Sequence, residues 1–188
     1  MKNRPVTGFL IAGGKSTRMK TDKGFVKYKG ISLAQYSLQI LSNFCQKVYI
    51  NSNNPRYERF GIEVITDSYL DKGPLGGILT CLEITQTELN LFLPVDTPNI
   101  SNEIIETLLH NSNNSDIIVP VKNNYVEPLI GIYKSSCQPL LAKFLKENKL
   151  KLVDILKESN TCYVNIDKSL NFYDENMFYN INSPDDLK

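Results

Sequence analysis

The chain alternates short apolar runs with longer segments that carry apolar residues at helical spacing. A short apolar run bounded by turn residues is typical of a buried strand, whereas apolar residues three and four positions apart are typical of a helix. The first pattern predicts strands at Phe9–Ile11, Val48–Ile50, Ile62–Thr66, Leu91–Leu93 and Ile117–Val119. The second predicts helices at Ile31–Phe44, with Ser32 as N-cap, and at Asn102–Leu109. It also predicts a helical stretch that follows the segment Gly73–Gly77 and runs to about Ile84.

The pattern changes beyond residue 120, where a hairpin and two shorter helices are predicted. Val121–Tyr133 has the pattern of a hairpin that turns at Asn123 and Asn124, with Pro128–Tyr133 returning to the sheet. The remaining predicted elements are helices at Cys137–Glu147 and Leu152–Glu158, a strand near Cys162–Asn165, and a last short helix after Ser183 and Pro184. Strands that alternate with helices indicate βαβ units. We therefore expect one α/β domain with a mostly parallel sheet and a small hairpin insertion in its second half.

Composition and charge narrow the classes of function. Of the 188 residues 41% are hydrophobic and 22% are charged, and the net charge is +1, so we expect an ordinary globular protein without nucleic acid as a partner. No apolar run approaches the roughly 20 residues that span a bilayer, and Met1–Arg4 carries no apolar signal segment. The four cysteines include no Cys-x-x-Cys pair and favour reduced thiols. The expected protein is cytoplasmic and does not bind membranes.

The segment after the first predicted strand carries the strongest candidate chemistry. Gly13 and Gly14 allow a sharp turn that brings backbone N–H groups close to a ligand, because glycine has no Cβ. A hydroxyl and four cations follow: Lys15, Ser16, Arg18, Lys20 and Lys23. Amide donors and cations at the end of a strand are typical of a polyphosphate site, although a turn followed by a solvated basic loop has the same composition. The spacing excludes a Walker A loop and a G-x-G-x-x-G loop, so we expect a third kind of phosphate loop.

Polar residues also follow the later strands, at the edge where an open parallel sheet binds ligands. They are Asn51, Asp67 and Asp96, together with the glycines of the Gly73–Gly77 segment that opens a predicted helix. Each alone is explained equally well as a turn former or a cap, but all are expected at one edge of the sheet. Asp96 lies between two prolines directly after a strand, and a rigid carboxylate beside a polyphosphate loop is a typical Mg²⁺ ligand. We therefore expect Asp96 to hold Mg²⁺.

These motifs resemble a known family. The segment IAGGKSTRMKTDKG, from Ile11 to Gly24, resembles the nucleotidyltransferase signature L-A-G-G-x-S-x-R-M-G-x-D-K. Within that superfamily the chain resembles the MobA-like molybdenum cofactor guanylyltransferases. The resemblance continues, in the family's order, through Val48–Asn53, Asp67, Gly73–Ile78, Pro94–Pro98, Glu127–Tyr133 and Asn180–Leu187. Lys20 departs from it, because the family has glycine at that position.

The resemblance implies a fold, a reaction and a set of site residues. The implied fold is a Rossmann-like three-layer sandwich, with a nucleotide-binding half at about 1–100 and an acceptor or pterin-binding half at about 101–188. The implied reaction transfers GMP from GTP to the phosphate of molybdenum-molybdopterin, with Mg²⁺ as cofactor and pyrophosphate as product. The implied nucleotide-binding residues are Ile11, Ala12, Gly13, Gly14, Lys23, Asn51, Asp67, Gly76, Gly77 and Asp96, the catalytic residues are Arg18, Lys23 and Asp96, and the acceptor-binding residues are Asn180 and Asn182. An anionic acceptor phosphate needs no strong general base, which suits a chain whose single histidine, His110, ends a predicted helix.

Three alternatives stay open at this level. A cytidylyltransferase would use CTP with the same pterin acceptor, and one sequence does not identify the base-selecting groups. A sugar-phosphate nucleotidyltransferase often has additional C-terminal elements, which are not expected here. A non-catalytic nucleotide- or molybdopterin-binding carrier is a different class of protein, but it would need neither Lys23 nor Asp96. Transient contacts with molybdopterin-processing proteins and with molybdoenzyme apoproteins are further expected.

Overall fold

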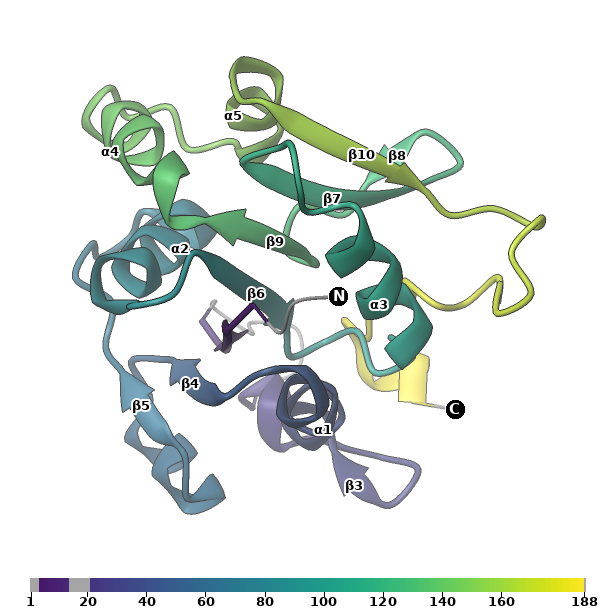
Figure 1. The fold of residues 1–188 in the computed structure, drawn as a ribbon. Helices are drawn as coiled ribbons and strands as arrows, with labels where there is room; N and C mark the ends of the chain where they lie inside the picture. The colour runs from purple at the N-terminus through teal and green to yellow at the C-terminus, as the bar shows by residue number, and fades with distance from the viewer. Residues whose placement is uncertain (1–3, 14–20, 188) are drawn as a thin grey trace.

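One mixed β-sheet forms the centre of the protein, and helices cover both of its faces (Figure 1). The computed structural model describes residues 4–13 and 21–187. Within these residues the strands of the sheet are β1 (Val6–Ile11), β4 (Lys47–Asn51), β5 (Glu63–Ile65), β6 (Leu89–Pro94), β7 (Ile117–Lys122), β8 (Tyr125–Val126), β9 (Gly131–Lys134) and β10 (Thr161–Asn165). Their order is β10-β7-β9-β6-β1-β4-β5, and β8 pairs with β7 outside this path. β1 is therefore an interior strand, with β6 on one side and β4 on the other.

The two parts of the sheet differ in strand direction. β1 runs parallel to both of its neighbours, and β4 runs parallel to β5. β9 is antiparallel to β6 and to β7, whereas β10 is parallel to β7. The expected α/β fold with a mostly parallel sheet is confirmed. Every antiparallel pairing of this sheet involves β8 or β9, which belong to the second half of the chain, where the hairpin insertion is predicted.

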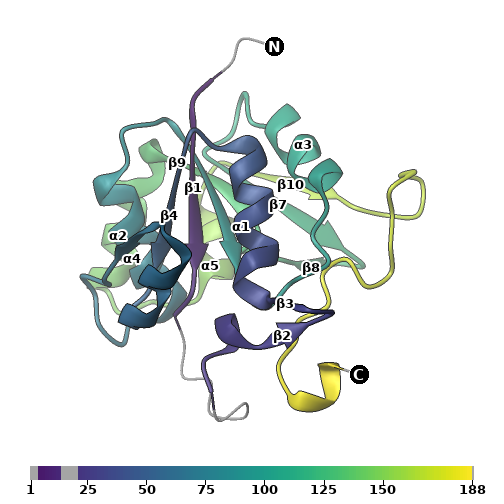
Figure 2. The ribbon, with the colours of Figure 1, turned by 90° about the horizontal axis from the view of Figure 1, so that it is seen from below.

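The helices form a layer on each face of the sheet. They are α1 (Leu33–Phe44), α2 (Gly73–Ile84), α3 (Asn102–His110), α4 (Gln138–Lys146) and α5 (Leu152–Glu158). One hydrophobic cluster joins α1 and α3 to one face, and a second joins α2, α4 and α5 to the other, so the fold is a three-layer sandwich (Figure 2). Among the described residues, none of the helices combines the length and the apolar character that a membrane crossing requires.

Strand β1 shows why the central strands have continuous apolar runs. All of its residues are buried, because a strand covered by helices on both faces needs apolar side chains at successive positions. Phe9 stacks on Tyr49 and Phe92, with ring centroids 5.4 and 5.1 Å away. Leu10 belongs to the hydrophobic cluster on the opposite face. The carboxyl end of β1 is thereby fixed between those of β4 and β6.

Helix α1 begins as its cap predicts, but two residues later than its apolar pattern indicates. The backbone N–H of Ser32 donates to Oε1 of Gln35 at 2.9 Å, which is one half of a capping box. The residues before the helix form β3 (Ile31–Ser32), which pairs antiparallel with β2 (Lys27–Tyr28). Ile31, which the apolar pattern assigns to the first turn of the helix, therefore pairs with Tyr28 in a strand instead.

Short elements make the remaining connections. Asn123 and Asn124 have φ values of 50° and 65° at the tip of the β7–β8 hairpin, as the sequence predicts for this turn. The 3₁₀ helices are η1 (Lys23–Phe25), η2 (Pro55–Phe60), η3 (Ser135–Cys137) and η4 (Pro184–Leu187). η4 stands where the last short helix is predicted. The segment before it returns to the end of β6, where the Ile181 N–H donates to the Asp96 carbonyl oxygen at 2.8 Å.

Candidate active site

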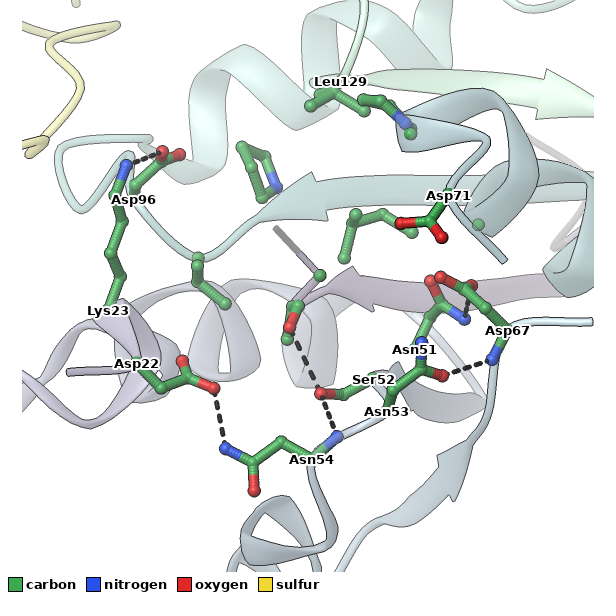
Figure 3. Close-up of a pocket in the computed structure, with 18 residues that line it drawn as sticks. Asp22, Lys23, Asn51, Ser52, Asn53, Asn54, Asp67, Asp71, Asp96 and Leu129 are labelled. Carbon is green, nitrogen blue, oxygen red and sulfur yellow. Dashed lines mark hydrogen bonds and ion pairs between the residues drawn. The ribbon is translucent and has the colours of Figure 1, made fainter. Parts of the chain in front are cut away.

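A cavity of about 790 Å³ opens at the carboxyl ends of β1, β4 and β6 (Figure 3). This is the edge at which open α/β sheets bind ligands. Of the residues predicted to bind nucleotide, those that line it are Ile11, Ala12, Gly13, Lys23, Asn51, Asp67, Gly77 and Asp96. The fold thus gathers into one cavity polar groups that are far apart along the chain.

Of the residues predicted to bind nucleotide or to be catalytic, three do not contribute to the described lining of this cavity. Gly14 and Arg18 lie outside the described residues. Gly76 is buried in α2, and a Cβ there would lie 2.8 Å from the carbonyl oxygen of Tyr69. The absence of a side chain at Gly76 therefore lets α2 pack against the segment that precedes it.

Asn51 and Asp67 form one end of the cavity. Asn51 ends β4 and is only 1% exposed, and its Nδ2 donates to Oδ1 of Asp67 at 2.8 Å and to the carbonyl oxygen of Ile65 at 3.3 Å. The backbone N–H of Asp67 donates to Oδ1 of Asn53 at 2.9 Å. Gly77 lies against this pair, since a Cβ there would lie 2.5 Å from Oδ1 of Asn51. The Asp67 carboxylate, which only accepts hydrogen bonds when ionised, is held in place at this end.

The other end of the cavity holds an ion pair (Figure 3). Nζ of Lys23 lies 3.0 Å from Oδ2 of Asp96 and donates to Oδ1 of Asn182 at 2.6 Å. Lys23 opens η1, Asp96 follows β6, and Asn182 belongs to the C-terminal segment. Three distant parts of the chain therefore meet at one ammonium group.

A second hollow, of about 260 Å³, lies beside the ion pair. It is lined by Pro94, Asp96, Thr97, Glu127, Pro128, Leu129, Ile130, Asn180 and Asn182. The hydroxyl of Thr97 donates to Oδ1 of Asn180 at 3.2 Å. Burial raises the pKa of the half-buried Glu127 carboxyl above its ordinary value, and the negative charge of Asp96 raises it further. The two predicted acceptor residues, Asn180 and Asn182, thus line a hollow that adjoins the main cavity at Asp96.

The oxygen atoms at the ion pair fit a hard divalent cation. The carboxylate of Asp96 and the amide oxygen of Asn182 converge on the Lys23 ammonium, and oxygen is the ligand atom that Mg²⁺ prefers. In the part of the chain that the structure describes, no group of three or more His, Cys, Asp and Glu side chains could hold a metal ion. A Mg²⁺ ion here would therefore take its other ligands from nucleotide phosphates and water, as this ion usually does.

The structure also adds cavity residues that the sequence analysis does not propose. They include Asp22, Ser52, Asn53, Asn54, Asp71 and Leu129. The sequence of the segment after β4 predicts no more than a turn. In the structure this segment holds two other parts of the cavity wall: Oγ of Ser52 donates to the Ala12 carbonyl at 3.2 Å, and Nδ2 of Asn54 donates to Oδ2 of Asp22 at 2.9 Å. The run of Asn and Ser directly after a buried strand is the sequence signal that could have found Ser52, Asn53 and Asn54.

Comparisons with known proteins agree with this geometry. Residues 8–162 match the family model of the MobA-like NTP transferase domain. A probable molybdenum cofactor guanylyltransferase from Flavobacterium johnsoniae is 34% identical over 97% of this chain and 94% of its own length. One from Halalkalibacterium halodurans is 33% identical over 96% and 94% of the two chains. The crystal structure of molybdopterin-guanine dinucleotide biosynthesis protein A from Archaeoglobus fulgidus superposes with a TM-score of 0.81 at 25% identity, covering 96% of this chain and 94% of that one.

The sheet order and the position of the cavity, taken with these similarities, define the protein as a nucleotidyltransferase. The chain belongs to the MobA-like NTP transferase family. The predicted fold, enzyme class and family are therefore confirmed.

Proposed function

We propose that this protein transfers GMP from GTP to the phosphate of molybdenum-molybdopterin and releases pyrophosphate. The relatives named as probable molybdenum cofactor guanylyltransferases support this reaction, because they are similar over nearly the whole chain. The observation that carries the proposal is the Lys23–Asp96 pair in the same cavity as the Asp67 carboxylate. A triphosphate needs the positive charge and the metal ligand that the Lys23–Asp96 pair offers. A base with hydrogen-bond donors needs an acceptor such as the Asp67 carboxylate.

The acceptor-only chemistry of Asp67 favours guanine. Guanine offers two adjacent donors, its N1–H and its N2 amino group, to an ionised carboxylate. Cytosine and adenine each offer a donor beside an acceptor on the corresponding edge, so a carboxylate pairs with only one of their groups. Asn51, which donates to Asp67, and the backbone of Ile11–Gly13 would complete the nucleoside site. This reasoning supports GTP over CTP.

Cations and backbone amides would hold the triphosphate. Lys23 brings a positive charge to the cavity, and we assign Arg18 and the amides of Gly13 and Gly14 to the phosphates as well. Asp96 and Asn182 would hold Mg²⁺, which neutralises phosphate charge when it is bound. These residues act by positioning and charge, which is what nucleotidyl transfer requires.

The chemical step exchanges one P–O bond for another. An oxygen of the acceptor phosphate forms a bond to the α-phosphorus of GTP, the bond from that phosphorus to the bridging oxygen breaks, and its electron pair leaves with pyrophosphate. The acceptor oxygen is already anionic, so no proton has to be removed. The single histidine, His110, ends α3 and lines neither cavity, which agrees with a reaction that needs no imidazole base. Lys23 and Arg18 would offset the charge on the leaving pyrophosphate.

We assign the acceptor to the smaller hollow. Asn180 and Asn182 line it, and Asp96 belongs to both cavities. This supports a nucleotide-binding half at about 1–100 and an acceptor-binding half at about 101–188, which would meet at the Lys23–Asn182 contact. Mg²⁺ as the metal, a cytoplasmic location, and transient contacts with molybdopterin-processing proteins and apoenzymes stay predictions.

The test combines nucleotide binding with pyrophosphate release. Titration calorimetry with GTP, CTP and ATP in Mg²⁺ should show a preference for GTP, and pyrophosphate should appear only when molybdenum-molybdopterin is added. D96A should lose this release, whereas D154A, at a half-exposed aspartate of α5, should keep it. A CTP preference would change the assigned base, and release with a sugar phosphate but not with the pterin would change the acceptor. Nucleotide binding without any release would indicate a carrier.

A further inference from the structure

Asp22 directly precedes Lys23, and both oxygens of its carboxylate accept hydrogen bonds. Oδ1 accepts from the Tyr57 hydroxyl at 2.7 Å and from the Gly24 N–H at 3.0 Å. Oδ2 accepts from Nδ2 of Asn54 at 2.9 Å. Three donors around one carboxylate fix both its position and its orientation. Asp22 is therefore tied to the segment that follows β4, and Gly24, on the other side of Lys23, is tied to Asp22.

The packing of η2 places Tyr57 for this contact. Its side chain is fully buried, and its ring centroid lies 4.7 Å from that of Phe25 and 5.9 Å from that of Phe60. Gly24 leaves room for the hydroxyl, since a Cβ there would lie 2.0 Å from it. Burial and the bond to Asp22 raise the pKa of the Tyr57 hydroxyl, so it stays protonated and remains a donor. Tyr57 does not line either cavity.

The same segment also holds the end of β1. The Ala12 N–H donates to the Asn51 carbonyl at 2.9 Å, and Oγ of Ser52 donates to the Ala12 carbonyl at 3.2 Å. The Asn54 N–H in turn donates to Oγ of Ser52 at 3.2 Å. Residues 12 and 22 are thus attached to one support, residues 51–57.

We propose that Tyr57 is a positioning residue for nucleotidyl transfer, which acts through Asp22 to fix the direction in which Lys23 enters the cavity. A lysine side chain is a flexible stem with a charge at its tip. When its backbone is held by bonded neighbours on both sides, the ammonium samples fewer positions, and without nucleotide and metal it stays near Asp96 and Asn182. The catalytic part of this inference rests on the proposed function, because it takes Lys23 as a phosphate ligand.

The matched variants are Y57F and Y36F. Y57F keeps the buried ring and removes only the hydroxyl that reaches Asp22. Y36F removes a comparable hydroxyl, which donates to the Tyr28 carbonyl at 2.8 Å and lines neither cavity. The difference between the two variants therefore isolates the contact with Asp22 from the general effect of losing a tyrosine hydrogen bond.

The first readout needs no substrate. The rate at which a small acylating reagent modifies the Lys23 amine is measured by peptide mass spectrometry, with the exposed Lys47 as internal reference. Y57F should raise the Lys23 rate severalfold, because the ammonium leaves its two partners more often, and Y36F should leave it unchanged. In the second readout, Y57F should lower kcat by about tenfold with little change in KM for GTP, and Y36F should behave as the wild type.

The outcomes separate this inference from the proposed function. If Y57F changes Lys23 labelling and kcat no more than Y36F does, or if it lowers only the melting temperature, Tyr57 is a structural residue and the inference is wrong. If the wild type releases no pyrophosphate, the proposed function fails, while the labelling still tests whether Tyr57 positions Lys23. D22N provides a second variant, since it replaces one acceptor oxygen by a donor and should raise the labelling rate in the same way.

Discussion

Lys23 and Asp96 are 73 residues apart in the sequence, yet Nζ of the lysine lies 3.0 Å from Oδ2 of the aspartate. Their side chains are only 18% and 23% exposed, so solvent screens this pair less than a surface ion pair. The pair joins the segment that follows β1 to the segment that follows β6. Its position marks where, in the proposed reaction, the phosphates of the two substrates would meet.

The charge of Lys23 is the first target for mutation. K23M keeps an apolar stem and removes the ammonium, and we expect kcat to fall by about 100-fold, as for other groups that stabilise developing charge. GTP affinity should change less, because the Asp67 end of the cavity is intact. Pyrophosphate release and calorimetry measure the two effects. K47M is the control, since Lys47 pairs with Glu63 on the surface, and equal kcat values for the two variants would contradict the assigned role.

The base preference should depend on the acceptor character of Asp67. In D67N the remaining oxygen can still accept from Nδ2 of Asn51, so the new amino group faces the cavity and opposes the donors of guanine. We expect GTP affinity to fall by about tenfold or more, and XTP, which carries an oxygen in place of the N2 amino group, to bind better than it does to the wild type. Competition calorimetry with GTP and XTP measures this change in base preference.

D154N serves as the control for the change in base preference, because Asp154 pairs with Lys157 on the surface of α5. It should leave the preference for GTP over XTP unchanged. A D67N protein that retains the wild-type preference would show that another group reads the base.

The close approach of α2 to Asn51 predicts a difference between two glycines of the cavity. In G77A the new Cβ would lie 2.5 Å from Oδ1 of a buried asparagine, whereas in G13A the nearest atom among the described residues, apart from the chain neighbours of Gly13, is Oδ2 of Asp67 at 4.0 Å. We expect G77A to lose about 1–3 kcal/mol of unfolding free energy and G13A to lose little. Urea denaturation of both variants tests this, and equal losses would mean that Asn51 moves aside without cost.

The raised pKa of Glu127 predicts a pH dependence of stability. An acid whose folded-state pKa lies above its unfolded value binds its proton more tightly in the folded protein, so its contribution to stability falls as pH rises from the unfolded value towards the folded one. E127Q should therefore be more stable than the wild type at pH 7, and the difference should shrink as the pH falls from the folded pKa towards the unfolded one. Urea denaturation at several pH values in a chelating buffer measures this.

Glu103 provides the control for the pH experiment, because its carboxyl is exposed and its pKa is lowered, mainly by the Ser101 hydroxyl. E103Q should gain nothing at pH 7. A wild-type protein that is as stable as E127Q at neutral pH would show that Glu127 meets no net cost when it ionises.

Local patterns in the sequence were enough to determine the class of fold. Buried apolar runs specify the central strands because both faces of β1 are covered, and the capping residue Ser32 and the Asn123–Asn124 turn act through neighbours a few positions away. The glycines and cations after β1 likewise predict a phosphate-binding loop, and this stays a prediction because residues 14–20 lie outside those that the structure describes. Sequence resemblance then led to the family, which the comparisons confirm.

The partners within the site were decided only by the tertiary structure. Lys23 contacts Asn182 across 159 residues, and Asp22 contacts Tyr57 across 35. Neither pair follows from a periodic pattern, because such a contact depends on the order of strands in the sheet, where β6 lies beside β1 and the C-terminal segment returns to the end of β6. Periodicity reports which face of an element is buried, whereas the partner across that face is set by packing of the whole chain. The sequence therefore determined which side chains could do the chemistry, and the packing of distant segments determined which of them act together.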